Sequence, residues 1–370
     1  MYIELDNEDD AYIIFETLNT RGKDLSVADL VKNYLTKNIK AKNSKVDLPK
    51  DKWGQIRDNI DSTTIDLDID TFLLHVWLSK YDFTTTKTLF KKLKNTIKPG
   101  QAKSFLDDLL MDSEIYKSVF DTQLRKWNRN ELPLKSSLDF LSSFKVTQQT
   151  PMVLSIMREF ASGRLKFKYA KEGLEAIEHF HYIFTAITSQ RSSGGIASMY
   201  STFARELYNA KDDSEKLNAI RELKGRMREK LPTYDEFLAS FRTLKFTNNY
   251  TRQKRILQYT LGKIDRHFNS SGVVINYEQM TLEHIAAQSI SHKPANYDEY
   301  VGTIGNLIFI DQKTNNDLAN RDFAEKIKTL IKSSVFVDDT LKSSLIWEQE
   351  QINQRTEDLA KLAFTKVFKI

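Results

Sequence analysis

The sequence has 370 residues and no cysteine, which excludes disulfide bonds and thiolate metal sites. Its 40% hydrophobic and 28% charged residues and its net charge of +5 are ordinary for a soluble globular protein and permit a nucleic-acid partner. No run of about 18 apolar residues occurs, and the acidic N-terminus MYIELDNEDD lacks the apolar segment of a signal peptide, so we expect a cytoplasmic protein.

Helices dominate the predicted secondary structure. Only 12 glycines and 6 prolines occur, and this scarcity favours long helices over a turn-rich β architecture. Taken in chain order, the helical spacing of apolar residues predicts helices at residues 9–18, 27–39, 53–60, 69–78, 87–97, 102–120, 152–160, 169–187, 196–208, 213–230, 251–268, 323–331 and 347–368. The predicted fold class is therefore mainly α, with an extended segment at residues 273–276 ahead of the C-terminal motifs.

Two basic runs interrupt the otherwise mixed charge pattern. The first contains lysines without an acid among them, and the second lies near the middle of the chain. Their members are Lys87, Lys91, Lys92, Lys94, Lys98 and Lys103, then Lys224, Arg226, Arg228 and Lys230. A solvated helix face is the ordinary interpretation of such runs, and a surface that tracks DNA phosphates is the alternative.

The N-terminal stretch carries a motif made of Phe15, Asn19 and Gly22, which LSVADLVKNYL follows. It resembles the end of the DUF262 domain of GmrSD-type restriction endonucleases, a ParB-like nucleotide-binding module with an FxxxNxxG motif. The upstream DGQQR motif of that module does not occur in this sequence. We therefore expect half of the nucleotide pocket to be missing and no NTPase activity in this chain alone. The alternative is that Asn19 and Gly22 only cap and turn a helix.

Residues 281–326 combine an acid, a histidine and several asparagines. Glu283 and His284 are adjacent, so on an extended chain they point to opposite sides. A segment at residues 304–310 reads as a strand that carries Asn306, followed by a turn at Asn315 and Asn316 and by a helix that starts near residue 320. A neutral histidine deprotonates water, and carboxylate and amide oxygens suit Mg²⁺. The stretch therefore predicts one general base beside one divalent metal.

The same stretch resembles DUF1524, the C-terminal HNH nuclease domain of GmrSD-type enzymes, whose catalytic element is a ββα-metal fold. The family pattern runs [DE]HIxPQ, then GNLxxL, then N..L.N..F..K. The counterparts in this sequence are Glu283, His284, Ile285 and Gln288, then Gly305, Asn306 and Leu307, then Asn315, Leu318, Asn320, Phe323 and Lys326. Ala287 replaces the proline of the pattern. The resemblance covers about residues 235–370 and implies a small ββα-metal element in the C-terminal domain.

The resemblance implies a separate role for each principal residue. His284 is expected to be the general base, and Glu283 and Asn315 the metal ligands. Asn306 is expected to brace the loop and orient the histidine. Asn316 is the rival of Asn315 for the ligand role. The implied cofactor is a divalent metal, Mg²⁺ in the first place and Mn²⁺ as the alternative.

Two further residues of the pattern are expected to support the site. Asn320 is expected to cap the following helix, and Lys326 to pack against the domain or to meet a phosphate. The expected substrate is DNA, modified or unmodified, and no membrane partner is expected. The further partner is either the missing nucleotide-binding part or a second copy of the chain.

Three segments follow from these motifs. Residues 1–45 are expected to be the remnant of a DUF262 domain, residues 46–234 a helical middle region, and residues 235–370 the DUF1524 nuclease domain. The resemblance implies a metal-dependent HNH endonuclease that hydrolyses DNA phosphodiester bonds within a type IV-like restriction or phage-defence protein. The alternative is a catalytically inert DNA-binding or assembly fragment of such a protein.

Overall fold

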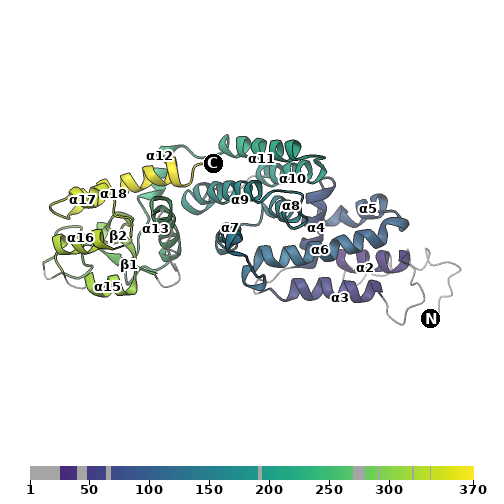
Figure 1. The fold of residues 1–370 in the computed structure, drawn as a ribbon, viewed down its shortest axis with the longest axis horizontal. Coiled ribbons are helices and arrows are strands. Elements are labelled where there is room, and N and C mark those ends of the chain that lie inside the picture. Colours follow the sequence, from purple (N-terminus) through teal and green to yellow (C-terminus); the bar gives the residue numbers. More distant parts are fainter. Residues whose placement is uncertain are drawn as a thin grey trace. The chain divides into compact units, whose positions relative to one another are not determined.

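The computed structural model describes residues 26–39, 48–63, 68–190, 194–269, 280–290, 292–318, 321–333 and 335–370. Helices account for most of these residues, which confirms the mainly α prediction. The chain divides into two compact units (Figure 1). Unit 1 comprises Met1–Glu178 and Ser192–Arg226, and unit 2 comprises His179–Arg191 and Met227–Ile370. In the described part of the chain, no helix combines the length and the apolar character that crossing a bilayer requires.

Unit 1 is a bundle of packed helices. Helix α6 lies against α3, and helices α4, α8 and α10 pack against one another. The helices are α2 (Val27–Asn38), α3 (Leu48–Asp61), α4 (Ile69–Lys80), α5 (Thr86–Thr96), α6 (Ala102–Phe120), α7 (Leu132–Ser143), α8 (Thr150–Ala161), α9 (Phe167–His181), α10 (Gly194–Asn209) and α11 (Asp213–Arg228), of which α9 and α11 end in unit 2. Their apolar faces form the core that the helical spacing of the sequence predicts.

Charged side chains inside unit 1 are paired. Asp112 of α6 is 1% exposed, and its carboxylate lies 2.6 Å from Nε of Arg158 and 2.8 Å from Nζ of Lys80. The guanidinium of Arg158 also donates to the hydroxyl of Ser79 at 2.9 Å. Burying a charge is costly unless a partner of opposite sign accompanies it. This cluster therefore fixes α4, α6 and α8 in one arrangement.

Unit 2 contains one antiparallel pair of strands among its described residues, with helices on both sides. Its elements are η5 (Tyr182–Ile187), α12 (Tyr234–Phe241), α13 (Lys254–Phe268), β1 (Met280–His284), α14 (Tyr297–Tyr300), η7 (Ile304–Asn306), β2 (Leu307–Asp311), α15 (Gln312–Leu318), α16 (Phe323–Lys332), α17 (Asp339–Ser343), α18 (Gln349–Leu362) and η8 (Ala363–Val367). Figure 1 shows β1 and β2 with α13 on one side, α16 on the other side and α15 below them. The chain order β1, β2, α15 gives two strands followed by a helix.

The register of the two strands decides which residues share a face. Glu283 lies opposite Ile308, and His284 lies opposite Leu307. Directly opposed residues of an antiparallel pair point to the same face. Ile308 belongs to a buried cluster with Leu318 of α15, so the Glu283 face of the sheet is the one that α15 covers. The two neighbours in the sequence thus leave the strand in opposite directions.

Two predictions for the C-terminal motifs are wrong in detail. The strand predicted at residues 304–310 begins only at Leu307, because Gly305 and Asn306 form a 3₁₀ turn ahead of it. The predicted turn at Asn315 and Asn316 is the middle of helix α15. This helix begins after Asp311, whose carboxylate accepts hydrogen bonds from the backbone and hydroxyl of Thr314 at 2.9 and 2.7 Å. The predicted elements at residues 9–18 and 273–276 lie outside the described residues.

Candidate active site

His284, the last residue of β1, has a defined tautomer. Its Nε2 atom lies 2.8 Å from the carbonyl oxygen of Phe246, which can only accept a hydrogen bond. Nε2 therefore carries the proton, and Nδ1 keeps its lone pair. The side-chain amide of Gln288 lies 3.3 Å from Nδ1 and donates to it. The histidine thus presents a basic nitrogen on one side while its other nitrogen is anchored to the backbone.

The surroundings of His284 favour the neutral ring. The side chain is 5% exposed. Burial lowers the pKa of His284 below its ordinary value of 6.5, and the positive charge of Lys326 lowers it further, against the opposing effect of the hydrogen bond to Phe246. The imidazole is therefore neutral at pH 7, which is the protonation state that a base requires.

The segment that carries Phe246 is held by the loop ahead of β2. The backbone nitrogen of Phe246 donates to the carbonyl of Gly302 at 2.8 Å, and that of Ile304 donates to Leu244 at 3.0 Å. The Phe246 ring stacks on the imidazole of His284, with centroids 5.8 Å apart. Lys254 places its ammonium 5.6 Å from the centre of the same ring. These contacts fix the acceptor that sets the tautomer, and they bring a cation to the same end of the sheet.

Glu283 meets a buried lysine on the opposite face of β1. The Nζ atom of Lys326 lies 3.4 Å from Oε1 of Glu283 and donates to the carbonyl oxygens of His284 and Ile285, each at 3.1 Å. Lys326 is 3% exposed, whereas the side chain of Glu283 is 23% exposed. The lysine therefore ties α16 to the chain that leaves β1, and the carboxylate keeps access to solvent.

Asn306 is fully buried, and all its polar atoms are satisfied. Its Oδ1 atom accepts from the backbone nitrogen of Ala286 at 2.8 Å and from Nε1 of Trp347 at 2.9 Å. Its Nδ2 atom donates to the carbonyls of Ala286 at 3.0 Å and Val301 at 2.7 Å. These four bonds join the chain after β1, the chain after α14, and the start of α18. The side chain lies within the loop and is directed at backbone groups.

Gly305 and Arg355 complete this loop from the side of α18. A Cβ atom on Gly305 would lie 2.1 Å from the carbonyl oxygen of Ile352, so no larger residue fits. The guanidinium of Arg355 is 2% exposed and donates to the carbonyls of Gly305 and Leu307 at 2.7 and 2.8 Å. Its Nε atom donates to Asp338 at 2.7 Å. The motif GNL is thus a backbone turn clamped by the C-terminal helix.

The asparagines of α15 differ in their contacts. Asn315 is half-buried, and its side chain makes no hydrogen bond to another described residue. Asn316 is exposed, and its amide oxygen accepts from Gln312 at 3.0 Å. Asn320 lies outside the described residues, and helix α16 takes its N-terminal cap from Asp322. Among the described residues, the side chain of Asn315 thus makes no hydrogen bond, whereas the amide oxygen of Asn316 already accepts one.

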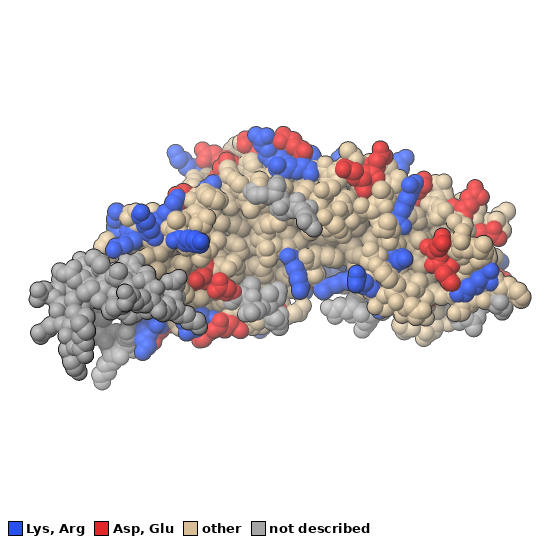
Figure 2. Space-filling model, turned by 180° about the vertical axis from the view of Figure 1, so that it is seen from behind, with Lys and Arg blue, Asp and Glu red and all other residues tan. Residues whose placement is uncertain are grey.

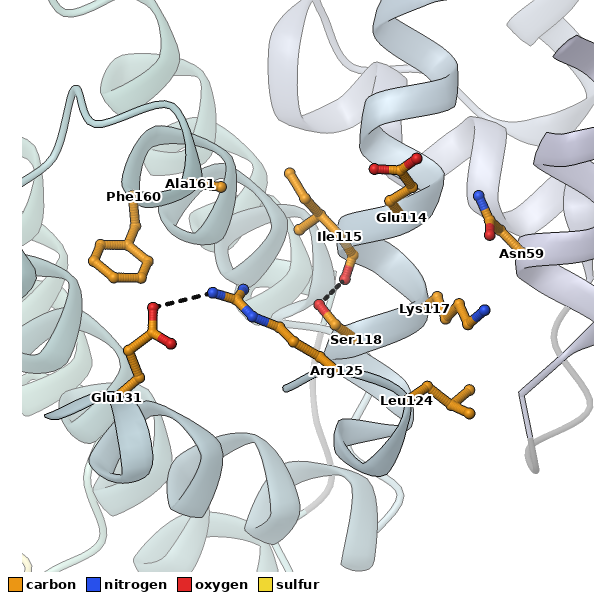
Figure 3. Close-up of a pocket in the computed structure, with 10 residues that line it drawn as sticks. All are labelled: Asn59, Glu114, Ile115, Lys117, Ser118, Leu124, Arg125, Glu131, Phe160 and Ala161. Carbon is orange, nitrogen blue, oxygen red and sulfur yellow. Dashed lines mark hydrogen bonds and ion pairs between the residues drawn. The ribbon is translucent and has the colours of Figure 1, made fainter. Parts of the chain in front are cut away.

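The remaining predicted site lies outside the described part of the chain. It consists of Phe15, Asn19 and Gly22, the residues of the N-terminal motif. Unit 1 has a cavity of about 610 Å³ between α3, α6 and the turn after α6, lined among others by Lys117, Arg125 and Glu131 (Figure 3). Arg125 already pairs with Glu131 at 3.2 Å. The cavity contains none of the residues that the sequence singled out.

Sequence reasoning missed the groups that orient the site. Phe246 acts through its backbone carbonyl, which leaves no signature in a side-chain motif. Trp347 and Arg355 lie more than 40 residues beyond the residues they hold, and the sequence assigned them only to a packing helix. The sequence carried no clear signal for this clamp, because the burial of Arg355 is a property of the folded structure.

A family model described as GmrSD restriction endonucleases, C-terminal domain, matches residues 232–362. No curated protein matches the chain. The matched segment contains both strands, η7, α15 and α16, and therefore all the residues of the candidate active site. The resemblance of the C-terminal stretch is thereby confirmed. Residues 232–362 are thus similar to the C-terminal domain of GmrSD restriction endonucleases.

Proposed function

We propose that unit 2 is a metal-dependent HNH-type endonuclease that hydrolyses DNA phosphodiester bonds. The observation that carries the proposal is the tautomer of His284. A histidine whose Nε2 is tied to a backbone carbonyl, and whose pKa is lowered by burial, has Nδ1 available as a base at neutral pH.

In this proposal His284 removes a proton from water at Nδ1. The Gln288 amide, 3.3 Å away, is a long hydrogen-bond partner that the incoming water replaces. The imidazolium that forms keeps its Nε2 proton on the carbonyl of Phe246, and this bond strengthens as the ring becomes charged. Stacking on the Phe246 ring holds the plane of the imidazole while the proton moves. The activated oxygen then attacks the phosphorus atom of the substrate. As the new P–O bond forms, the bond from phosphorus to the leaving sugar oxygen breaks, and that oxygen takes up a proton from solvent.

Glu283 and Asn315 fit a divalent cation. Both supply oxygen donors, which Mg²⁺ and Mn²⁺ prefer. Glu283 lies on the sheet face that α15 covers, its carboxylate is partly exposed, and its contact with Lys326 is long at 3.4 Å. Asn315 on α15 has no side-chain hydrogen bond to another described residue. When bound, the cation neutralises the phosphate and the leaving oxygen. The described residues contain no group of three or more His, Cys, Asp or Glu side chains that could hold a metal.

The biological setting that this activity suits is restriction of foreign DNA. The chain then acts as the nuclease part of a phage-defence protein, and residues 232–362 supply the cleavage chemistry. The alternative is a fragment that binds DNA or assembles with partners without cleaving it.

The test is cleavage of supercoiled plasmid by the full chain with Mg²⁺ or Mn²⁺ and with EDTA. We expect His284→Ala to reduce nicking by at least 100-fold, the usual range for loss of a general base. His292→Ala is the matched control, since His292 is exposed and eight residues away in the sequence (292 − 284). Nicking by His284→Ala at the parental rate, or equal nicking in EDTA, contradicts the proposal. Salt-sensitive DNA binding without cleavage by the parent favours the alternative.

A further inference from the structure

A tight turn at residues 247–250 lies beside the proposed base. The backbone nitrogens of Thr247 and Tyr250 each donate to the other residue's carbonyl at 3.1 Å, so Asn248 and Asn249 take the two central positions of the turn. The backbone N–H of Asn248 points out of the turn and donates to Oε1 of Gln288 at 2.9 Å. The turn thus holds the oxygen end of the Gln288 amide.

This donor decides which end of the Gln288 amide faces His284. A backbone N–H can only donate, so the atom opposite it must be the amide oxygen. The NH₂ group of Gln288 then lies 3.3 Å from Nδ1 of His284 and 3.4 Å from Oδ1 of Asn248. Because an NH₂ group can only donate, Nδ1 must accept. The carbonyl of Phe246 requires the same tautomer from the other side of the ring.

The three residues form a line from the interior to the surface of unit 2. His284 is 5% exposed, Gln288 is half-buried, and Asn248 is exposed. A water molecule therefore reaches Nδ1 from the side of Gln288. The bond at the oxygen end of the amide is 2.9 Å long, whereas the contact at its nitrogen end is at the long limit of hydrogen bonding. The amide can thus release the ring while the turn keeps hold of its oxygen.

The groups on this line are neutral, and what they specify is the direction of a hydrogen bond. On the face of the molecule that Figure 2 shows, Lys and Arg side chains lie interspersed with Asp and Glu side chains, so charge does not single out a substrate surface on that face. Between Gln288 and His284, in contrast, a donor faces an acceptor. A small neutral molecule that both accepts and donates fits between them, and water is such a molecule.

We propose that Gln288 positions the water molecule that His284 deprotonates. The water enters between the amide and Nδ1, accepts a hydrogen bond from Nε2 of Gln288 through one lone pair, and gives its proton to Nδ1. Its second lone pair forms the bond to phosphorus. Asn248 is then a positioning residue that acts through Gln288. The inference rests on the proposed function and adds to it the group that orients the nucleophile.

The first test measures kcat and KM for plasmid nicking by the full chain with Mg²⁺. Gln288→Glu keeps an oxygen opposite the backbone N–H of Asn248 but replaces the NH₂ group that donates. Gln288→Met removes both polar ends. We expect each change to lower kcat on the order of 10²-fold, the scale of a misplaced reactant, and to leave KM near the parental value, because the contact acts on the reacting water. A side chain that only linked the turn to the chain after β1 would tolerate glutamate, so a parental kcat in Gln288→Glu overturns the inference.

The second test changes the turn and leaves Gln288 in place. Asn248→Pro removes the N–H that holds the amide, and proline suits this position because Asn248 has no positive φ and is the first central residue of the turn. We expect kcat to fall by about 10-fold, again without a large change in KM. Asn249→Ala, at the exposed second central position, is the control and keeps the parental kcat. Circular dichroism verifies the fold of both variants. Equal kcat values in the two variants overturn the role of the turn.

The His284→Ala protein in the same assay separates this inference from the proposed function. If His284→Ala is inactive and Gln288→Met retains the parental kcat, the positioning of water by Gln288 is wrong and the proposed nuclease stands. If His284→Ala nicks plasmid at the parental rate, both are overturned. Loss of kcat in His284→Ala, Gln288→Met and Gln288→Glu, with KM preserved in the Gln288 variants, supports both.

Discussion

Lys326 of α16 reaches across to β1 and places its ammonium 3.4 Å from the carboxylate of Glu283. The same ammonium donates to two backbone carbonyls, those of His284 and Ile285. One buried charge thus holds both the proposed ligand and the backbone of the proposed base. Because a single side chain serves both, changes at Lys326 are expected to affect the fold of unit 2 before they affect its chemistry.

Lys326→Met is expected to destabilise unit 2 by about 2 kcal/mol. Two buried carbonyls lose their donor, and an unsatisfied buried acceptor costs roughly 1–3 kcal/mol, while removal of a buried charge offsets part of that loss. The measurement is urea unfolding followed by hydrogen exchange in the peptides of unit 2. Lys328→Met, an exposed position on the same helix, is the control and is expected to change stability by less than about 0.5 kcal/mol. Equal stability of the two variants contradicts this role for Lys326.

Asn306→Ala is expected to cost about 3–5 kcal/mol. It removes four hydrogen bonds in a fully buried position and leaves the indole of Trp347 and the backbone of Ala286 without partners. The emission of Trp347 is expected to change in the folded state, which can be read in a protein whose other tryptophans are replaced by phenylalanine. Asn316→Ala serves as control, because Asn316 is exposed. A loss below about 1 kcal/mol in Asn306→Ala shows that the loop is not braced by this side chain.

Gly305→Ala is expected to prevent the native packing of α18. The added Cβ would lie 2.1 Å from a backbone oxygen and 2.3 Å from the hydroxyl of Thr356, closer than atoms can approach. Limited proteolysis should therefore cleave α18 rapidly in the variant. Gly225→Ala is the matched substitution in α11, where nothing lies within 4 Å of the new atom, and it is expected to stabilise by about 0.5–1 kcal/mol. A protease-resistant Gly305→Ala protein shows that α18 can move away.

The buried ring of His181 is expected to make the folded protein less stable as the pH falls. Its ring is 1% exposed, Nδ1 lies 2.9 Å from the hydroxyl of Thr185, and burial lowers the pKa of His181 to about 3. The unfolded chain titrates near pH 6.5, so between pH 6.5 and about 3 the folded state binds fewer protons and its stability falls as the pH falls.

At pH 5 the lowered pKa of His181 reduces the free energy of unfolding by about 2 kcal/mol relative to pH 7, at 1.36 kcal/mol for each pH unit below 6.5. His181→Gln removes the titrating ring and is expected to shrink the stability difference between pH 7 and pH 5 by that amount. Urea unfolding at the two pH values measures it. His267→Gln, at an exposed histidine, provides the comparison. An identical pH dependence in the parent and His181→Gln excludes the buried ring as its source.

The sequence alone predicted most of the long helices among the described residues because amphipathic spacing is a local property, but it did not predict α7 or α12. It also placed the acid and the base next to each other on a strand, where alternation sends their side chains apart. It did not predict that Asn306 leaves the strand, because the reason lies in its four partners, two of which are backbone groups of Ala286. Nor did it predict that Asn315 lies within a helix, since the run QKTNNDL has weak helical propensity and depends on the cap from Asp311.

The hydrogen bond from His284 to Phe246 joins residues 38 positions apart in the sequence. The smallest segment that contains the complete proposed nuclease site is therefore longer than its motifs. A fragment that begins at β1 contains every motif residue, yet its histidine is free to take the other tautomer. A search for related proteins by motif alone will accept such fragments. Transfer of the proposed site to another protein, in contrast, requires a segment that begins before residue 244 and continues through α18.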